Sequence, residues 1–318
     1  METRTCGGRL YVVATPLGNL ADLSPRAAQT LAAVAVIAAE DTRHSRPLLN
    51  HYGIRTPLLA LHEHNEAAQT GRLIERLRQG EDVALISDAG TPAISDPGQR
   101  LVAAAHAAGV SVVPLPGPCA AVAALSASGL PSVRFAFEGF LPARAAARQA
   151  ALAALVEEPR TLIFYEAPHR LLALLDDMAA VFGDRPVALA KELTKIHEAV
   201  ISGDAESLKA WLRAEPGRER GEFVLVVQGA PERPQATDDI DALLGRLLAV
   251  LPLKQAVTAA VAVSEAPRNR VYRRALALQA APAQPTLAPA GSRTGNRAPL
   301  DEVHGGEESP GSTGRGAR

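Results

Sequence analysis

Short apolar runs alternate with longer amphipathic segments through the first 130 residues. The runs are too short for helices and rich in Val, Ile, Leu and Ala, so they predict buried strands at residues 10–14, 34–39, 58–61, 83–87 and 110–115. Helix signals stand between them: Ser24-Pro25 is a typical helix start, and Gly80 and Gly109 are typical helix ends. This alternation predicts an N-terminal α/β domain over residues 1–130 with a mostly parallel sheet.

The pattern changes after Gly129-Leu130-Pro131. Strands are expected at residues 135–140, 161–165, 187–190 and 222–228, and residues 198–202 read as the returning arm of a hairpin. Helices are expected at residues 143–158, from 166–170 to about 182, and around Trp211. We therefore predict a second α/β domain over residues 131–230, with some antiparallel pairing.

The C-terminal part divides into a helical segment and a tail. Residues 230–238 form a polar, Pro-containing linker, and three short helical patterns follow at residues 239–250, 253–263 and 267–279. Small helices before a basic helix are typical of a helix-turn-helix, so residues 238–279 are expected to form a nucleic-acid-binding domain. Residues 280–318 contain no aromatic residue and are rich in Ala, Pro, Gly and charge, which predicts a disordered tail.

Composition narrows the functional class. The chain has 318 residues, 47% of them hydrophobic, a formal net charge of −1 and two cysteines. A charge this small gives no global attraction to nucleic acid, so such a partner has to meet a local basic patch. Two isolated cysteines, with no secretory signal and no apolar run of membrane-spanning length, favour a reducing cytoplasm over export or a membrane.

Two strand-to-loop junctions in the first domain are typical of a ligand site. Residues 83–98 and 110–121 each pass from a buried strand into a loop of small residues, Gly and Pro, as parallel sheets do where they bind ligands. Asp88 is the only charge at the mouth of the first loop and is expected to accept hydrogen bonds from a ligand, while Asp96 is expected to cap the next helix. No G-x-G-x-x-G phosphate motif is present, which favours an adenosine-like cofactor held by backbone groups.

Charged residues also follow other strands. Residues 40–43, residues 166–170 and Lys191-Glu192 are either surface ion pairs or parts of one cleft. His62-Glu63-His64 suggests a metal pair on one strand face, but no third ligand stands at a suitable spacing, so no metal is predicted. The last helix carries Arg268, Arg270, Arg273 and Arg274 around Tyr272, which favours phosphate contact.

These segments together resemble the tetrapyrrole-methylase superfamily, the class III methyltransferases that use S-adenosylmethionine. The resemblance runs from about Leu10 to Leu278. It is carried by residues 14–20, 39–43, 85–92, 114–120, 164–170 and 191–195. Ser87-Asp88-Ala89 stands where porphyrinoid-modifying members have Gly-Asp-Pro. That difference, with the helical appendage, points to the branch that modifies RNA.

The resemblance implies two α/β domains, commonly in a homodimer, with S-adenosylmethionine bent in the cleft between the domains. Carried over by position, its contacts are expected from Pro16, Leu17, Asp88, Thr91, Ile94, Cys119, Ala120 and Tyr165. The implied reaction is methylation of the ribose 2′-hydroxyl of a cytidine in the decoding centre of 16S ribosomal RNA (position 1402 in the usual numbering), within the 30S subunit.

For this reaction Lys191 and Glu192 are expected nearest the reacting hydroxyl. RNA phosphates are expected to contact Arg43, Arg170, Arg270, Arg273 and Arg274. Two alternatives stay open from the residues alone. One is a methylase of the same fold that acts on a porphyrinoid or another small molecule. The other is a non-enzymatic regulator that binds nucleic acid.

Overall fold

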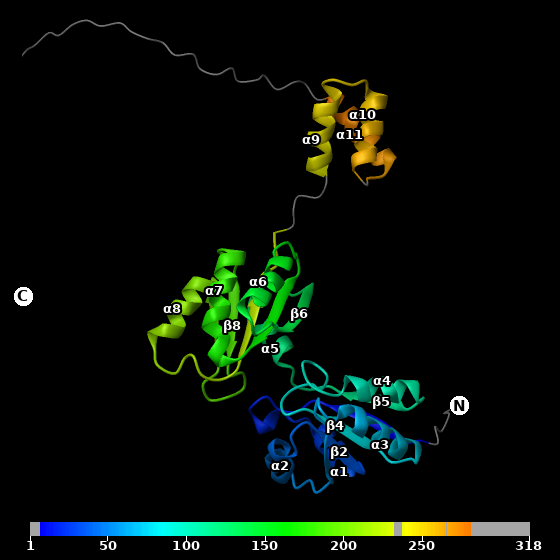
Figure 1. Ribbon diagram of the computed structural model, residues 1–318, viewed down its shortest axis with the longest axis vertical. Helices are drawn as coiled ribbons and strands as arrows, with labels where there is room; N and C mark the ends of the chain where they lie inside the picture. Colours follow the sequence, from blue (N-terminus) through cyan, green and yellow to red (C-terminus); the bar gives the residue numbers. More distant parts are fainter. Residues whose placement is uncertain (1–6, 232–236, 265, 281–318) are drawn as a thin grey trace, which may run out of the picture. The chain divides into compact units, whose positions relative to one another are not determined.

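The computed structural model describes residues 7–231, 237–264 and 266–280. The chain falls into two compact units, Met1–Glu232 and Arg233–Arg318. The first unit contains two β-sheets and the second contains three helices (Figure 1). None of the helices within these described ranges is both long and apolar enough to cross a membrane.

The first sheet has the strand order β3-β2-β4-β1-β5, and all of its pairings are parallel. Its strands are β1 (Arg9–Val13), β2 (Val36–Ala39), β3 (Leu58–Ala60), β4 (Val83–Ile86) and β5 (Ser111–Leu115). The parallel sheet predicted from the sequence is therefore confirmed. All carboxyl ends lie at one edge, which is where ligands of open parallel sheets bind.

Helices cover both faces of this sheet (Figure 1). Helices α1 (Pro25–Ala33) and α2 (Thr42–His51) pack on one face, and α3 (Glu66–Arg78) and α4 (Gln99–Ala107) on the other. Alternate residues of a strand point to opposite faces, so Leu10 joins one core and Val13 the other. Burial on both sides explains why these strands read as continuous apolar runs.

The second sheet has the order β6-β7-β10-β8-β9. Its strands are β6 (Phe135–Phe140), β7 (Thr161–Glu166), β8 (Val187–Lys191), β9 (Ala199–Gly203) and β10 (Phe223–Val227). Strand β10 is antiparallel to both neighbours, β8 and β9 form a hairpin, and β6 is parallel to β7. The predicted antiparallel pairing and the returning hairpin arm are confirmed.

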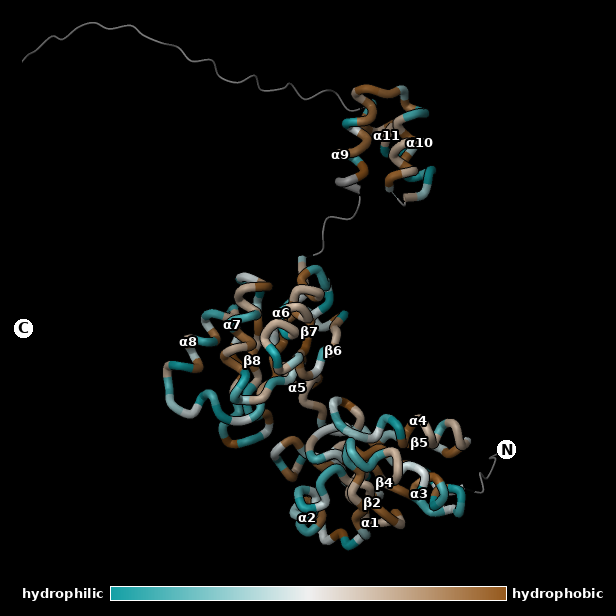
Figure 2. The backbone as a smooth tube through the Cα atoms, viewed as in Figure 1, coloured by the Kyte–Doolittle hydropathy of each residue, from teal (hydrophilic) through white to brown (hydrophobic). Residues whose placement is uncertain are grey.

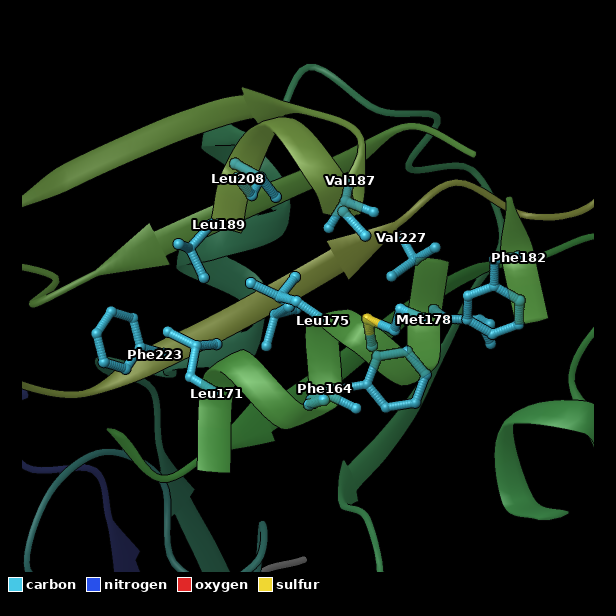
Figure 3. Close-up of a cluster of buried hydrophobic side chains, with 14 of the residues drawn as sticks. Phe164, Leu171, Leu175, Met178, Phe182, Val187, Leu189, Leu208, Phe223 and Val227 are labelled. Carbon is cyan, nitrogen blue, oxygen red and sulfur yellow. The ribbon is translucent and has the colours of Figure 1, made fainter. Parts of the chain in front are cut away.

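The second sheet is covered by helices on both faces. One face carries α6 (Ala145–Ala154), α7 (Leu171–Phe182) and α8 (Ala205–Ala214), whose apolar side chains meet those of the strands in one cluster (Figure 3). Helix α6 ends earlier than predicted. The other face is covered by α5 (Ala120–Ala127), which follows β5 of the first sheet. The predicted domain boundary at residue 130 lies after α5. Because α5 packs on the second sheet, the core around that sheet already begins before this boundary.

The second unit consists of α9 (Thr237–Leu248), α10 (Leu253–Val263) and α11 (Arg268–Ala280). Apolar positions recur along each helix between polar ones (Figure 2). Their buried members form a separate core: Ile240, Leu244, Val257, Ala260, Val271 and Ala275. The three predicted helices are confirmed. The predicted tail from residue 281 onward lies outside the described residues.

Candidate active site

Hydrogen bonds join the three loops that follow β1, β4 and β5. The Thr15 amide donates to the Gly90 carbonyl at 2.8 Å, and the Gly90 amide donates to the Thr15 carbonyl at 3.0 Å. The Thr91 hydroxyl donates to the Pro118 carbonyl at 2.9 Å. Gly90 has φ +87°, and a Cβ there would lie 3.2 Å from the side chain of Leu17. Glycine is therefore needed at the point where the first two loops meet.

The loop between β4 and α4 contains strained backbone. Ala93 and Ser95 have φ values of 68° and 66°, a region that side-chain-bearing residues rarely occupy. Ile94 lies between them and is 39% exposed. Strained residues of this kind are often found at ligand sites, because their conformation aims a neighbouring side chain. Here the strained turn presents Ile94 to a cavity.

That cavity, called the central cavity below, has a volume of about 380 Å³ and is lined by the segments that follow β1, β4 and β5 and by strands of the second sheet. This volume lies within the usual range for small-molecule sites, and the walls combine apolar side chains with a few polar groups, as such sites do. The structure brings six of the predicted cofactor residues together on its walls: Leu17, Thr91, Ile94, Cys119, Ala120 and Tyr165.

Two predicted cofactor residues, Pro16 and Asp88, do not line the central cavity. Pro16 is buried within the first loop. The Asp88 carboxylate accepts a hydrogen bond from the Asp41 amide at 3.0 Å. Asp88 therefore ties the end of β2 to the end of β4, which positions the loops.

Tyr165 connects the second sheet to α5. Its hydroxyl oxygen accepts a hydrogen bond from the Ala121 amide at 3.0 Å. Its ring packs edge-on against Phe137 and Phe140, with ring centroids 4.9 Å and 5.6 Å away. Burial, with Cys119 adding to the effect, raises the pKa of Tyr165 to about 12. The hydroxyl thus keeps its proton at neutral pH.

The predicted catalytic pair, Lys191 and Glu192, lies beside the central cavity but does not line it. Lys191 is 7% exposed, and its ammonium donates to the Arg220 carbonyl at 2.6 Å. The Glu192 carboxylate accepts hydrogen bonds from the Glu222 amide at 2.9 Å and from Lys195 at 3.0 Å. Burial works to raise the pKa of Glu192, but these donors outweigh it and the pKa lies below its usual value.

These contacts give Lys191 and Glu192 a clear structural task. They fix the loop between β8 and β9, whose Leu193 stands on the cavity wall. Their assignment as the groups nearest the reacting hydroxyl stays a prediction.

A second cavity, called the side cavity below, has a volume of about 530 Å³. It lies among the segments that follow β2, β3 and β4 and is lined by Glu40, His62, Glu63, His64, Glu66, Ser95, Asp96, Pro97, Gly98, Gln99 and Arg100. Ser95 and Asp96 line both cavities. The two cavities therefore share a wall.

The expectation that Asp96 caps α4 is wrong. The residue at the N-cap is Gly98, with φ 127°, and it has no side chain to cap with. The Glu66 carboxylate of α3 performs this task instead, accepting from the Gly98 amide at 3.0 Å and the Arg100 amide at 3.1 Å. The turn through Gly98 leaves Asp96 on the shared wall. One sequence signal pointed to it: the Ser-Asp pair at residues 87–88 recurs at residues 95–96.

The carboxyl group of Asp96 lies in an unusual environment. Burial raises the pKa of Asp96 to about 6, against a hydrogen bond with Ser87 that lowers it, and the charge of Asp88 adds to the rise. Burial also raises the pKa of Glu40, with further contributions from Asp96 and Asp88. The shared wall therefore holds a carboxyl group that changes its charge not far below neutral pH.

The predicted RNA-binding arginines differ in their accessibility. Arg43 is 90% exposed along its side chain and pairs with Asp41 at 2.8 Å. Arg170 is mostly buried, 3.0 Å from the fully buried Glu166 side chain, and donates to the Leu141 carbonyl. On α11, Arg270, Arg273 and Arg274 are all exposed, and Arg274 also pairs with Asp241 of α9. Arg43, Arg270 and Arg273 are accordingly the better placed to meet a phosphate.

His62 and His64 lie in a turn after β3, so the argument for two imidazoles on one strand face does not apply. Their exposed rings are 6.1 Å apart in an edge-on arrangement. Across the part of the chain that the structure describes, no three His, Cys, Asp or Glu side chains are grouped so that they could hold a metal ion.

Two family models match the chain. The model for tetrapyrrole (corrin/porphyrin) methylases matches residues 9–209. The model for the RsmI C-terminal HTH domain matches residues 234–279, which confirms the predicted helix-turn-helix. Among solved structures, a diphthine synthase matches with a TM-score of 0.54 and 16% identity, over 70% of this chain and 90% of its own. This likeness shows that the two proteins share a fold over the matched part of the chain.

Curated relatives are similar over most of the chain. A Pseudomonas aeruginosa protein named ribosomal RNA small subunit methyltransferase I is 55% identical over 277 residues, which cover 86% of this chain and 98% of the relative. A protein of the same name from Escherichia coli O157:H7 is 51% identical over 276 residues, covering 86% of this chain and 96% of the relative.

Proposed function

The chain belongs to the tetrapyrrole methylase family of S-adenosylmethionine-dependent methyltransferases, and from this premise we propose that it methylates the ribose 2′-hydroxyl of a cytidine in 16S ribosomal RNA. The observation that carries the proposal is the similarity over nearly the full length of relatives named for small-subunit ribosomal RNA. A family of methyltransferases gives no support to the alternative of a non-enzymatic regulator.

The central cavity fits the cofactor by volume and by the chemistry of its walls. S-adenosylmethionine has a flat adenine, a ribose, a sulfonium and an amino-acid end, and the cavity offers apolar walls beside hydroxyl and carboxyl groups. A Cβ at Gly90 would lie 3.2 Å from the side chain of Leu17, so glycine at this position lets the backbone itself form part of the cavity wall. We assign Leu17, Thr91, Ile94, Cys119, Ala120 and Tyr165 to cofactor contacts.

When bound, the cofactor supplies an electrophilic methyl group. The work left to the protein is alignment and proton transfer, because a ribose hydroxyl is a poor nucleophile while protonated. The strained turn at Ile94 and the hydrogen-bonded loops give a preorganised wall. Asp88 is assigned a positioning role, since its carboxylate holds the Asp41 amide at the end of β2.

The acceptor is assigned to the RNA of the small subunit, in the assembled 30S particle. The exposed Arg43, Arg270 and Arg273 are suited to phosphate contact. A porphyrinoid acceptor would leave the basic helix α11 without a role. A homodimer and a cytoplasmic location stay predictions.

Transfer of labelled methyl from S-adenosylmethionine to 30S subunits that lack the modification tests the proposal. We expect label in the 16S RNA at a linkage that resists alkaline cleavage, as a 2′-O-methylated linkage does. Ala120→Phe places a ring in the central cavity and is expected to weaken cofactor binding at least about tenfold, by overpacking. Ala103→Phe, on the exposed side of α4, is the matched control and is expected to leave binding unchanged.

The outcomes separate the acceptors. Cofactor binding without label in RNA would reject ribosomal RNA and favour a small-molecule acceptor. Label at an alkali-labile linkage would keep RNA and reject the ribose hydroxyl. Equal cofactor binding by Ala120→Phe and wild type would reject the central cavity as the cofactor site.

A further inference from the structure

We propose that the side cavity receives the nucleoside that is methylated, and that Asp96, on the wall shared by the two cavities, accepts the proton of its ribose hydroxyl. This inference rests on the proposed function, because it takes a ribonucleotide as the acceptor. It adds an acceptor site and a catalytic residue.

The first argument is position. Methyl transfer requires the attacking oxygen, the methyl carbon and the sulfur to lie in line, so the acceptor has to occupy a space that borders the cofactor. The side cavity does so through Ser95 and Asp96. Another cavity of about 400 Å³ borders the central cavity through Pro168, so none of its titratable side chains stands on the wall shared with the cofactor site.

The second argument is the chemistry of the walls. His62 and His64 expose their rings, and proteins that bind unpaired RNA bases stack them on such rings. Glu40 adds a carboxyl group, the usual acceptor for the exocyclic amine of cytosine. Arg100 is exposed at the same cavity and suits a neighbouring phosphate. A volume of about 530 Å³ is in the range of sites for molecules of this size.

The third argument concerns Asp96 itself. The backbone on either side is fixed, by the left-handed Ser95 and by Gly98, whose amide is held by Glu66 at 3.0 Å. The groups that face Asp96 are Ser87, Asp88, Glu40 and the Tyr165 hydroxyl. Burial raises the pKa of Asp96 to about 6. The group is therefore ionised at neutral pH and more basic than an ordinary aspartate, which suits a general base.

The proposed step is balanced. The proton of the 2′-hydroxyl passes to a carboxylate oxygen of Asp96 as the 2′-oxygen bonds to the methyl carbon. The carbon–sulfur bond breaks, sulfur keeps the electron pair, and the sulfonium becomes a neutral thioether. The proton then leaves Asp96 to solvent through the side cavity.

Asp96→Asn tests the base in the full-length protein. We measure cofactor affinity by calorimetry, 30S affinity by filter binding, and the single-turnover methylation rate at pH 8. The rate is expected to fall about 100-fold or more, with both affinities within about threefold of wild type. Asp184→Asn, at an exposed aspartate that lines neither the central nor the side cavity, is the control and keeps the wild-type rate. A rate above one-tenth of wild type, or loss of cofactor binding, would overturn the role of Asp96.

His62→Ala/His64→Ala tests the acceptor cavity. Loss of the stacking surface is expected to raise the KM for 30S subunits roughly 10-fold while cofactor affinity is unchanged. His106→Ala, an exposed histidine of α4, is the control. An unchanged KM in the double variant would reject the side cavity. If wild-type protein does not methylate 30S subunits at all, the proposed function itself fails, and that result is distinct from either outcome for the variants.

Discussion

At the scale of single residues, Asp96 shows how a functional group can oppose stability. Its pKa is raised to about 6 by burial, from an ordinary value of 3.8, so the folded state binds its proton more tightly than the unfolded chain does. A carboxyl group shifted upward lowers the free energy of unfolding as pH rises through the interval between the two values. The destabilisation by Asp96 is complete above about pH 6 and absent below about pH 4.

Asp96→Asn is therefore expected to raise the free energy of unfolding at pH 7.5 by roughly 1 kcal/mol, a value reduced for solvent screening because the group is only half-buried. Urea denaturation between pH 4 and pH 8 measures it. The gain should vanish near pH 4. Loss of the Asp96 charge also removes one of the causes that raise the pKa of Glu40, so Glu40 adds to the gain with the same sign. A gain that is the same at every pH would assign the effect to packing instead of charge.

The same residue marks a limit of sequence reasoning. Asp followed by Pro is a common helix start, so a local interpretation assigns Asp96 to capping. The actual cap comes from Glu66, which is 32 residues away from Gly98 in sequence. Local propensity contains no information on which distant carboxylate reaches a helix end. Asp88 shows the converse, since its place at a strand end was predictable but its hydrogen bond to the Asp41 amide was not.

At the scale of elements, strands and helices followed closely from the sequence, because period and turn residues are local signals. Ser24, for example, caps α1 as its place before Pro25 predicts, accepting from the Ala27 amide at 3.1 Å. The cavities could not be predicted in the same way. The side cavity depends on segments after β2, β3 and β4 converging, and only the fold brings Glu40, His62 and Asp96 together.

Two loops from different sheets meet at Gly18, and this contact is open to a direct test. A Cβ on Gly18 would lie 2.3 Å from Cγ of Lys195, which forms ion pairs with Glu192 and Glu222. Gly18→Val should displace the loop between β8 and β9, and with it Leu193 on the wall of the central cavity. We expect cofactor affinity to fall about tenfold, as overpacking of this size predicts.

The matched control is Gly71→Ala in α3, where a Cβ meets nothing within 4 Å. That change should leave cofactor affinity unaltered and raise the melting temperature slightly, because alanine favours a helix. Calorimetric titration with S-adenosylmethionine measures both variants. If Gly18→Val bound the cofactor as wild type does, the contact between the two loops would have no part in forming the cavity.

At the scale of the whole molecule, the chain divides its tasks between two units with separate cores. The cavities belong to the first unit, so S-adenosylmethionine binding should not depend on the basic helix α11 of the second. RNA binding is expected to draw on both. All three arginines Arg270, Arg273 and Arg274 of α11 are exposed, but Arg274 also joins α11 to α9 through Asp241, so its removal would disturb the core of the second unit as well.

Arg270→Ala/Arg273→Ala in the full-length protein should therefore weaken binding to 30S subunits about tenfold at physiological salt and leave cofactor affinity unchanged. The slope of log K against log salt concentration should become shallower by about 1.5, since each lost phosphate contact contributes roughly 0.7 to 0.9 to that slope. Arg144→Ala/Arg213→Ala removes two exposed arginines of the first unit and controls for net charge. Equal slopes for the two double variants would mean that α11 acts only through its charge, and an unchanged slope for Arg270→Ala/Arg273→Ala would remove α11 from the RNA contact altogether.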